Sequence, residues 1–450
     1  MTDPGGPVPR APEADGLVAG AAAATAQATP GGSPEDMAAG PSRPASGLSG
    51  WVAFTHRDFA LYFAARFLSA TALHMQAVAV GWLIYDLTRN AFALGLVGLA
   101  AFLPAVGLAL VTGHAADRFD RRAILLVTCA IFALAGAGLV AFAHSGSREV
   151  WPIYALVVLF GVARAFAFPA GQALVPNLVP PEHFSNAVAL NSSAWQTATI
   201  VGPAMGGFLY AFGPTVVFAA VTGCFVVTFL LILAIRHRSA VRVAEKVNWA
   251  ALMAGIRFIR SRPVILGAIS LDLFAVLLGG ATALLPIYAR DILDVGPWGL
   301  GLLRSMPAAG AVCMALLLAH RPLARRTGRR MFQAVVVFGL ATIVFGLSES
   351  FPLSLAALFV LGTADMVSVF VRQTLVQIDT PDAMRGRVSA VNAVFIGASN
   401  ELGEFESGTL AALAGPVAAV VVGGIGSVAV AALWARWFPD LRTRDRLVTC

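Results

Sequence analysis

Several ionisable side chains lie inside long apolar segments of this sequence, where they could take up and release protons or hold a charged solute. Glu401, Glu404 and Glu406 are three carboxylates within one such segment. Glu401 and Glu404 share a helix face through their spacing, whereas Glu406 points away from that face. Three carboxylates in apolar surroundings cannot all stay ionised at low cost, so we expect at least one to carry a proton. The alternative is that all three face an outer aqueous vestibule.

Further polar residues in apolar segments are candidates for proton or solute binding, because such residues are rare in membranes and usually functional. Asp272 is one, with a position close to the cytoplasmic surface as the alternative. His74 and Gln76 could donate hydrogen bonds to a solute in a central cavity. Arg66 could face the same cavity, but we expect its long stem to extend to the inner membrane surface. The histidines and cysteines lack metal-ligand spacing, so we expect no bound metal.

The elements that position these residues are predicted to be membrane-spanning helices. Hydrophobic residues make up 58% of the chain and charged residues 12%, with a mean hydropathy of +0.79, which no single polar surface could cover. A spanning helix needs roughly 20 apolar residues, and continuous apolar runs exclude the alternating pattern of a barrel. We therefore predict an all-α integral membrane protein with twelve transmembrane helices. Their ranges are 59–84, 92–113, 123–143, 151–172, 187–212, 215–235, 263–289, 298–319, 331–348, 352–374, 388–413 and 416–437.

Polar segments flank and separate two predicted six-helix bundles. Residues 1–50 are rich in Ala, Gly, Pro and Ser and cannot bury a core, which predicts a disordered tail. In 237–262, apolar and basic residues alternate in a way that suits a short interfacial helix, and a plain linker is the equal alternative. The predicted domains are a cytoplasmic tail 1–50, an N-terminal bundle 51–236, a cytoplasmic linker 237–262, a C-terminal bundle 263–437 and a cytoplasmic C-terminal tail 438–450.

Basic residues in the predicted loops set the orientation, because Arg and Lys concentrate on the cytoplasmic side. With both termini inside, the outer loops carry Arg89, Arg148 and Arg290, and far more Arg and Lys lie in the inner loops. The excess charge of +7 then faces an anionic lipid leaflet, and a nucleic-acid partner is disfavoured.

The two bundles are predicted to be copies of one another in the same orientation. Residues 102–107 (FLPAVG) match residues 305–310 (SMPAAG) at an offset of 203. Parallel repeats place a binding site at their interface, near the middle of the bilayer. At an offset of 201, Arg164 aligns with Asp365, so opposite charges occupy equivalent places. The two could form a permanent ion pair, or Asp365 could exchange between Arg164 and a proton or cationic substrate.

A charged turn between the second and third predicted helices is repeated, in altered form, at 321–330. In the first copy its defining residues are Gly113, Asp117, Arg118, Arg121 and Arg122. Asp117 could pair with Arg121 or Arg122 and meet the positive N-terminus of the helix that begins near Arg387. Contacts of roughly 1 kcal/mol each would hold the cytoplasmic side shut in one state and break in another. Arg325 replaces the acid in the second copy, which indicates a topology anchor there.

This turn resembles the signature loop of the major facilitator superfamily, G-x-x-x-D-R-x-G-R-R, with Asp120 in place of the second glycine. The segments 65–69 (ARFLS), 255–263 (GIRFIRSRP) and 380–387 (TPDAMRGR) look like the branch that includes the enterobactin exporter and macrolide efflux proteins.

A second motif is similar to the antiporter motif G-P-x-x-G-G of drug and proton exchangers. Its residues are Gly202, Pro203, Gly206 and Gly207. The glycines would allow close approach to a neighbouring helix, and the proline bends its own helix. Such an interface could stay dry and prevent leakage during exchange, or it could be ordinary small-residue packing. Glu404 aligns with Pro203, so an acid replaces this motif in the second half.

The resemblance implies a secondary transporter that exports a small organic compound by proton antiport and alternating access. It implies a bacterial cytoplasmic (inner) membrane location, and we expect a monomer without cofactors, driven by the proton gradient. The substrate could be siderophore-, drug- or metabolite-like. Proton-coupled nutrient uptake is the alternative within this fold. A membrane-embedded enzyme or receptor is the alternative from another class, and we expect no enzymatic activity.

Overall fold

The computed structural model describes residues 49–108, 111–112, 115, 118–236, 249–321 and 326–445. The chain forms two units, Met1–Gly50 and Trp51–Cys450, and nearly all described residues belong to the second. The predicted tail up to residue 48, the linker residues 237–248, and Gly113, Asp117 and Arg325 lie outside the described residues.

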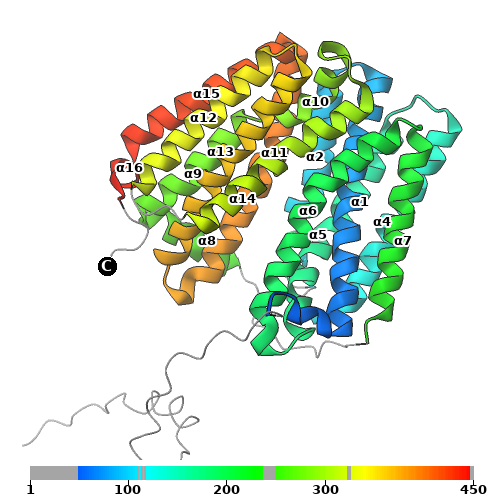
Figure 1. Cartoon of the computed structure of the whole chain (residues 1–450), viewed down its shortest axis with the longest axis horizontal. Helices are drawn as coiled ribbons and strands as arrows, with labels where there is room; N and C mark the ends of the chain where they lie inside the picture. The colour runs from blue at the N-terminus through cyan, green and yellow to red at the C-terminus, as the bar shows by residue number, and fades with distance from the viewer. Residues whose placement is uncertain are drawn as a thin grey trace, which may run out of the picture. The chain divides into compact units, whose positions relative to one another are not determined.

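Long helices joined by short turns occupy the N-terminal predicted spans (Figure 1). They are α1 (Arg57–Thr88), α2 (Ala91–Gly107), α4 (Arg121–Ser145), α5 (Trp151–Leu174), α6 (Phe184–Tyr210) and α7 (Pro214–Ala234), with short helices η2 (Ser49–Thr55), η3 (Val175–Asn177) and η4 (Pro181–His183). Residues in the turns determine where these helices begin and end. The Asn90 side chain accepts a hydrogen bond from the Phe92 amide at the start of α2. Gly213 separates α6 from α7 with a φ of 110°, a conformation that favours glycine.

The C-terminal half is built in the same way, with one interrupted span. Its helices are α8 (Trp249–Ser261), α9 (Pro263–Leu278), η5 (Ala281–Leu284), α10 (Leu285–Ile287), η6 (Tyr288–Ile292), α11 (Gly296–His320), α12 (Thr327–Leu347), α13 (Phe351–Ile378), α14 (Asp382–Ala414), α15 (Pro416–Trp437) and α16 (Pro439–Thr443).

The predicted span 263–289 lies within the apolar helical segment Pro263–Ile292, but it is not one continuous α-helix. Gly279 and Gly280 end α9, and the chain continues through η5, α10 and the π-helical η6. Glycine is a poor helix former, and Pro286 has no amide hydrogen to donate to the preceding turn. At Gly280 a β carbon would lie 2.6 Å from the Gly403 carbonyl oxygen, so α14 approaches this break closely.

Within the described ranges, nine helical segments are long and apolar enough to cross a membrane, and Ala91–Pro104 is a shorter apolar helix. The two remaining predicted spans, 187–212 and 388–413, are occupied by the long helices α6 and α14. An all-helical membrane protein is thus confirmed, while the count of twelve spans stays a prediction.

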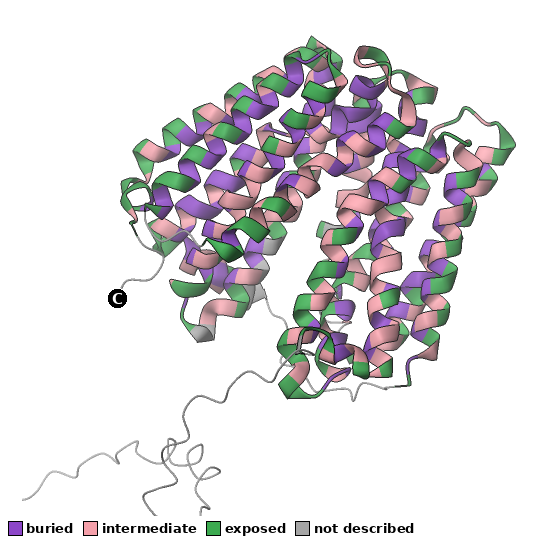
Figure 2. Ribbon diagram, viewed as in Figure 1, coloured by how far each residue is buried: buried purple, intermediate pink, exposed green. Residues whose placement is uncertain are grey.

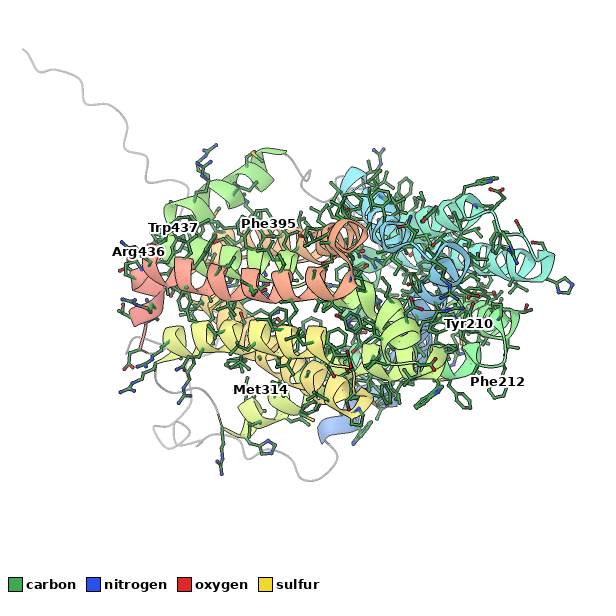
Figure 3. The ribbon with its side chains drawn as sticks, turned by 90° about the horizontal axis from the view of Figure 1, so that it is seen from above. Tyr210, Phe212, Met314, Phe395, Arg436 and Trp437 are labelled. Carbon is green, nitrogen blue, oxygen red and sulfur yellow. The ribbon has the colours of Figure 1, made fainter. Side chains whose placement is uncertain are left out.

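The outer faces of the helices carry exposed apolar side chains. Figure 2 shows buried and exposed residues on different faces of the same helices. Leu134, Leu230 and Leu413 are among the large exposed hydrophobics, and Phe212, labelled in Figure 3, projects from the end of α6. Apolar patches of this extent indicate contact with lipid.

Two segments predicted as linker and tail are folded in part. The predicted amphipathic helix exists as α8, whose buried Ile259 packs with Val388 and Val391 of α14, so protein rather than lipid covers that side chain. In the predicted tail 438–450, α16 buries Leu441 against the rest of the C-terminal half, and Arg444 forms an ion pair with Asp379 at 3.0 Å.

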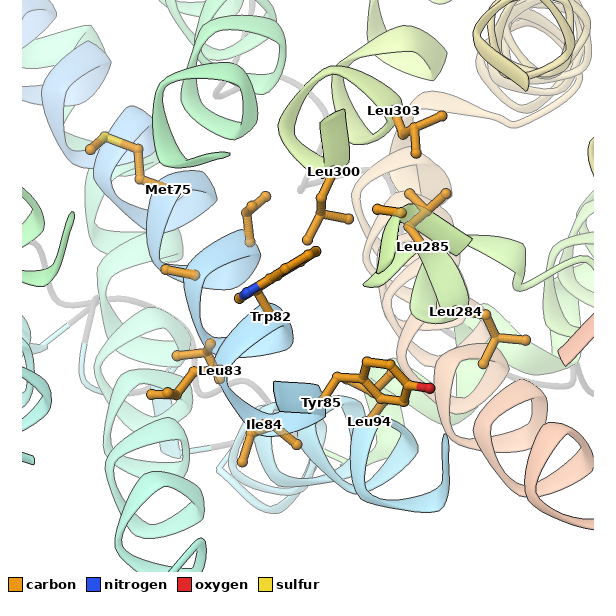
Figure 4. Close-up of a cluster of buried hydrophobic side chains, with 14 of the residues drawn as sticks. Met75, Trp82, Leu83, Ile84, Tyr85, Leu94, Leu284, Leu285, Leu300 and Leu303 are labelled. Atoms are coloured by element: carbon orange, nitrogen blue, oxygen red, sulfur yellow. The ribbon is translucent and has the colours of Figure 1, made fainter. Parts of the chain in front are cut away.

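One hydrophobic core joins the two halves near the ends of α1 and α2. It packs side chains of α1 and α2 against side chains of η5, α10 and α11, including those labelled in Figure 4. The other buried clusters each lie within one half. The halves therefore share buried apolar surface at one end, which we call the closed end.

Candidate functional site

A cavity of about 220 Å³ lies between the two halves. Side chains from α1, α2, α5, α6, η5, α10, α11 and α14 line it. Its polar lining residues are His74, Gln76, Arg164, Trp195, Arg304, Glu401 and Glu404. The structure thus brings together five residues singled out from the sequence and adds Trp195 and Arg304.

An ion pair crosses this cavity from one half to the other. Arg164 Nη2 of α5 lies 2.5 Å from Glu401 Oε1 of α14, and the side chains are 48% and 15% exposed. The predicted pairing of Arg164 with Asp365 is therefore wrong. Alignment of the repeats identifies residues at the same place in each bundle. Such residues lie on opposite sides of the axis that relates the two bundles, so they need not be in contact.

A second ion pair lies within the C-terminal half beside the first. Arg304 Nη2 of α11 lies 3.4 Å from Glu404 Oε1. Glu401 and Glu404 therefore share a face of α14, as predicted, and this face lines the cavity. Glu406 is absent from the cavity lining and lies 3.4 Å from the Ser407 hydroxyl. Arg304 was missed, although an arginine within an apolar segment is itself a signal for function.

Trp195 of α6 packs against two polar residues of α1. The Arg66 guanidinium lies 4.7 Å from the centre of the Trp195 indole, and the His74 ring packs edge-on against it. Arg66 thus makes a cation–π contact, and its buried Nε has no hydrogen-bond partner within the described structure. Its extension to the membrane surface stays a prediction. The buried His74 Nε2 is also unpartnered within the described structure.

A separate cluster of charges is buried in the C-terminal half. Arg372 Nη1 of α13 lies 2.8 Å from Asp272 Oδ2 of α9, and the two side chains are 2% and 6% exposed. Asp272 and Asp365 line the same small cavity. Asp272 is therefore buried within the C-terminal half, while its distance from the cytoplasmic surface stays a prediction. Arg372 was missed, although it too lies within an apolar segment.

The described arginines of the charged turn close the ends of neighbouring helices. Arg121 donates to the Ala173 carbonyl at the end of α5, and Arg122 donates to the Ile232 and Leu233 carbonyls at the end of α7. Carbonyls in the last turn of a helix lack partners and carry partial negative charge, so cations stabilise them. Arg118 is exposed. Arg121 and Arg122 thus link α4 to the ends of α5 and α7 within the N-terminal half. They do more than serve as ion-pair partners for an acidic residue of the turn.

The glycines of the antiporter-like motif lie where α6 meets both α1 and α11. A β carbon on Gly206 would lie 2.9 Å from Met75 Cα of α1, and one on Gly207 would lie 2.8 Å from Gly301 Cα of α11. On Gly202 it would lie 2.6 Å from His74 Cβ. Pro203 lies inside α6, and its carbonyl approaches Gly301. Gly207 and Pro203 thus bring α6 close to α11 of the other half, whereas Gly202 and Gly206 bring it close to α1 of its own half.

We predict that Gly207→Ala lowers the midpoint of thermal unfolding, because the added methyl group must separate α6 from α11. Overpacking of this kind costs about 1–3 kcal/mol. Gly223→Ala is the matched control, since a β carbon there meets nothing within 4 Å and alanine favours the helix. Differential scanning fluorimetry of the purified protein in detergent measures both, and equal midpoints for the two variants would contradict this interpretation.

Ion pairs between the halves surround the core at the closed end. Arg89 Nη1 lies 3.1 Å from Asp291 Oδ1, and the Tyr85 hydroxyl donates to the other Asp291 oxygen. Arg290 pairs with Asp86 and lies over the Trp82 ring. Each pair joins a residue of the N-terminal half to one of the C-terminal half. The site is therefore a cavity between two bundles that are fastened together at one end.

Comparison with known proteins extends this description. A family model described as transmembrane secretion effector matches residues 48–446. The chain is 29% identical over 393 residues to the enterobactin exporter EntS of Citrobacter koseri, which covers 86% of this chain and 93% of that protein. The enterobactin exporter EntS of Shigella boydii is 27% identical over 391 residues, with coverage of 86% and 93%.

Solved structures agree with the predicted fold. The nucleoside transporter NupG has a TM-score of 0.64 at 13% identity and covers 85% of this chain and 99% of its own. A bacterial homologue of the iron transporter ferroportin, in an inward-facing state, has a TM-score of 0.63 at 16% identity and covers 86% and 99%. The resemblance to major facilitator transporters is thereby confirmed at the level of the fold.

Proposed function

We propose that this chain, which belongs to the family of transmembrane secretion effectors, drives export by exchange with protons and alternating access. Its relatives are exporters, and the chain is a multi-pass membrane protein that exports a small organic compound. Uptake of a nutrient is not favoured by these relatives. Proton exchange, the direction of opening and the identity of the substrate are the parts that we propose.

The observation that carries alternating access is the Arg164–Glu401 pair across a cavity between two bundles. An ion pair that joins the bundles at the cavity can exist in one arrangement of the halves and break in another. A substrate that enters the cavity competes for the same guanidinium and carboxylate groups. Binding is thereby linked to the relative position of the halves, which is the requirement for alternating access.

We propose that the closed end faces the outside of the bacterial inner membrane. The loops at this end hold Arg89, Arg148 and Arg290, whereas most basic loop residues lie at the other end. Both termini are then cytoplasmic, and the structure represents the state that is shut toward the outside. We further propose a monomer that uses the proton gradient, without a cofactor and without enzymatic activity.

A siderophore such as enterobactin is the first substrate to test, because curated relatives carry that name. The purified chain in proteoliposomes would receive enterobactin and a panel of drug-like and metabolite-like compounds under an imposed pH gradient. We expect accumulation against a concentration gradient that disappears when an ionophore collapses the pH gradient. Accumulation that persists with the ionophore, in the absence of a membrane potential, would overturn proton exchange. It would not affect the assignment of the fold.

A further inference from the structure

We infer that the exchanged proton binds to a cluster of Asp272 on α9 with Asp365 and Arg372 on α13, apart from the central cavity. The Arg372–Asp272 pair and the small cavity shared by Asp272 and Asp365 define this cluster. The inference rests on the proposed proton antiport and names its proton-binding site.

The distribution of charge distinguishes the cluster from the central cavity. Around the cavity each glutamate has its own guanidinium, Glu401 with Arg164 and Glu404 with Arg304. In the cluster, two carboxylates share the single guanidinium of Arg372. With every group ionised, one negative charge is left over on the partly buried Asp365, and an uncompensated charge in these apolar surroundings is costly. One proton removes that charge, whereas protonation in the central cavity would break a complete ion pair.

The surroundings of the cluster supply no second cation among the described residues. From α12, Val335 and Phe338 line the shared cavity, and from α9 Ala275 and Val276 do so. The polar neighbours are Ser368 on α13 and Asn392 on α14, whose side-chain oxygen lies 3.5 Å from Arg372 Nη1. The cavity has a volume of about 10 Å³, which is close to the smallest space that holds a water molecule. The space beside the two carboxylates is therefore large enough for a single water.

Two contacts connect the cluster to the helix that lines the central cavity. Arg372 reaches Asn392 on α14, the helix that also carries Glu401 and Glu404. The break that ends α9 packs against α14 as well, with Gly280 close to the Gly403 backbone. When Asp365 takes up a proton from water it ceases to attract Arg372, which then interacts with Asp272 and Asn392 alone. Loss of that proton to water on the other side reverses the change, so the position of α14 follows the charge of Asp365.

A spectroscopic titration tests the site without knowledge of the substrate. The purified full chain in lipid membranes would be titrated with acid while infrared difference spectra record the C=O stretch of protonated carboxylic acids. We expect a titrating band in the wild type that Asp365→Asn and Asp272→Asn weaken or abolish. Glu404→Gln is the matched control and should retain it. Arg372→Met should strengthen the band, because two carboxylates without a cation take up an additional proton, and Arg372→Lys should preserve the wild-type band.

Transport separates failure of this inference from failure of proton antiport. With a gradient of one pH unit, the wild type should accumulate substrate by about tenfold per exchanged proton, while Asp365→Asn should reach a ratio of about one and still carry substrate downhill. Wild-type transport that ignores the pH gradient would overturn proton antiport. Coupled export retained by Asp365→Asn, or an infrared band lost in Glu404→Gln and kept in Asp365→Asn, would overturn the cluster alone.

Discussion

Arg164→Gln is expected to lower the rate of export by about 10-fold to 100-fold, because it removes the ion pair that joins the halves across the cavity. Truncating one partner of a buried charge pair costs about 2–5 kcal/mol, and the partial exposure of Arg164 reduces that cost. Glu401 is then left without a cation between the two bundles. Initial rates in proteoliposomes, with the amount of inserted protein measured in parallel, give the effect.

The same helix provides a matched control for this prediction. Glu406→Gln removes a carboxylate from α14 that does not line the cavity and contacts Ser407. Its export rate should stay close to that of the wild type. The double exchange Arg164→Glu with Glu401→Arg restores opposite charges and should recover part of the lost rate. Equal losses in Arg164→Gln and Glu406→Gln would mean that the loss of any charge from these helices, rather than the loss of this ion pair, slows transport.

The helices follow from the sequence because each one depends on local properties. A continuous apolar run predicts a spanning helix wherever residues such as Asn90 and Gly213 end it. The interrupted span after α9 was missed for the same reason, since hydropathy alone ignores the two adjacent glycines and Pro286. Its local signal was present in the residue types. Its exact form depends on the approach of α14, which no local pattern contains.

The charged members of the site could be predicted from the sequence, but their pairing and the place of Trp195 could not. Charged residues within apolar segments are candidates for function, and this rule selected Arg164, Asp272 and Asp365. The same rule would have selected Arg304 and Arg372. Pairing depends instead on which helices meet in space. Arg164 and Glu401 are 237 residues apart, and repeat alignment suggested Asp365 in place of Glu401. Alignment of the two repeats therefore identifies functional positions. Which of these residues touch can be known only from the arrangement of both bundles.

Removing the ion pairs at the closed end is expected to shift the balance between the state that is shut at this end and the state that is open there. Asp86→Asn combined with Asp291→Asn removes both charged contacts that fasten the halves there. Exposed pairs contribute about 0.2–1 kcal/mol each, so the double variant should favour opening at this end by roughly tenfold. The apolar contacts between the halves at this end are kept, so we expect a shift in the balance between the two states and no unfolding of either bundle.

Spin labels at Glu149 and Glu349, exposed residues at the closed end of the N-terminal and C-terminal halves, would report this shift as a longer distance by electron paramagnetic resonance. The background would lack the native cysteines. Asp294→Asn is the matched control, because it removes an exposed carboxylate from the same turn as Asp291 without a described ion pair. If the double variant keeps the wild-type distance distribution, the apolar core alone holds this end shut. If it opens, the ion pairs set how readily substrate leaves, and transport limited by opening at this end should become faster in the same variant.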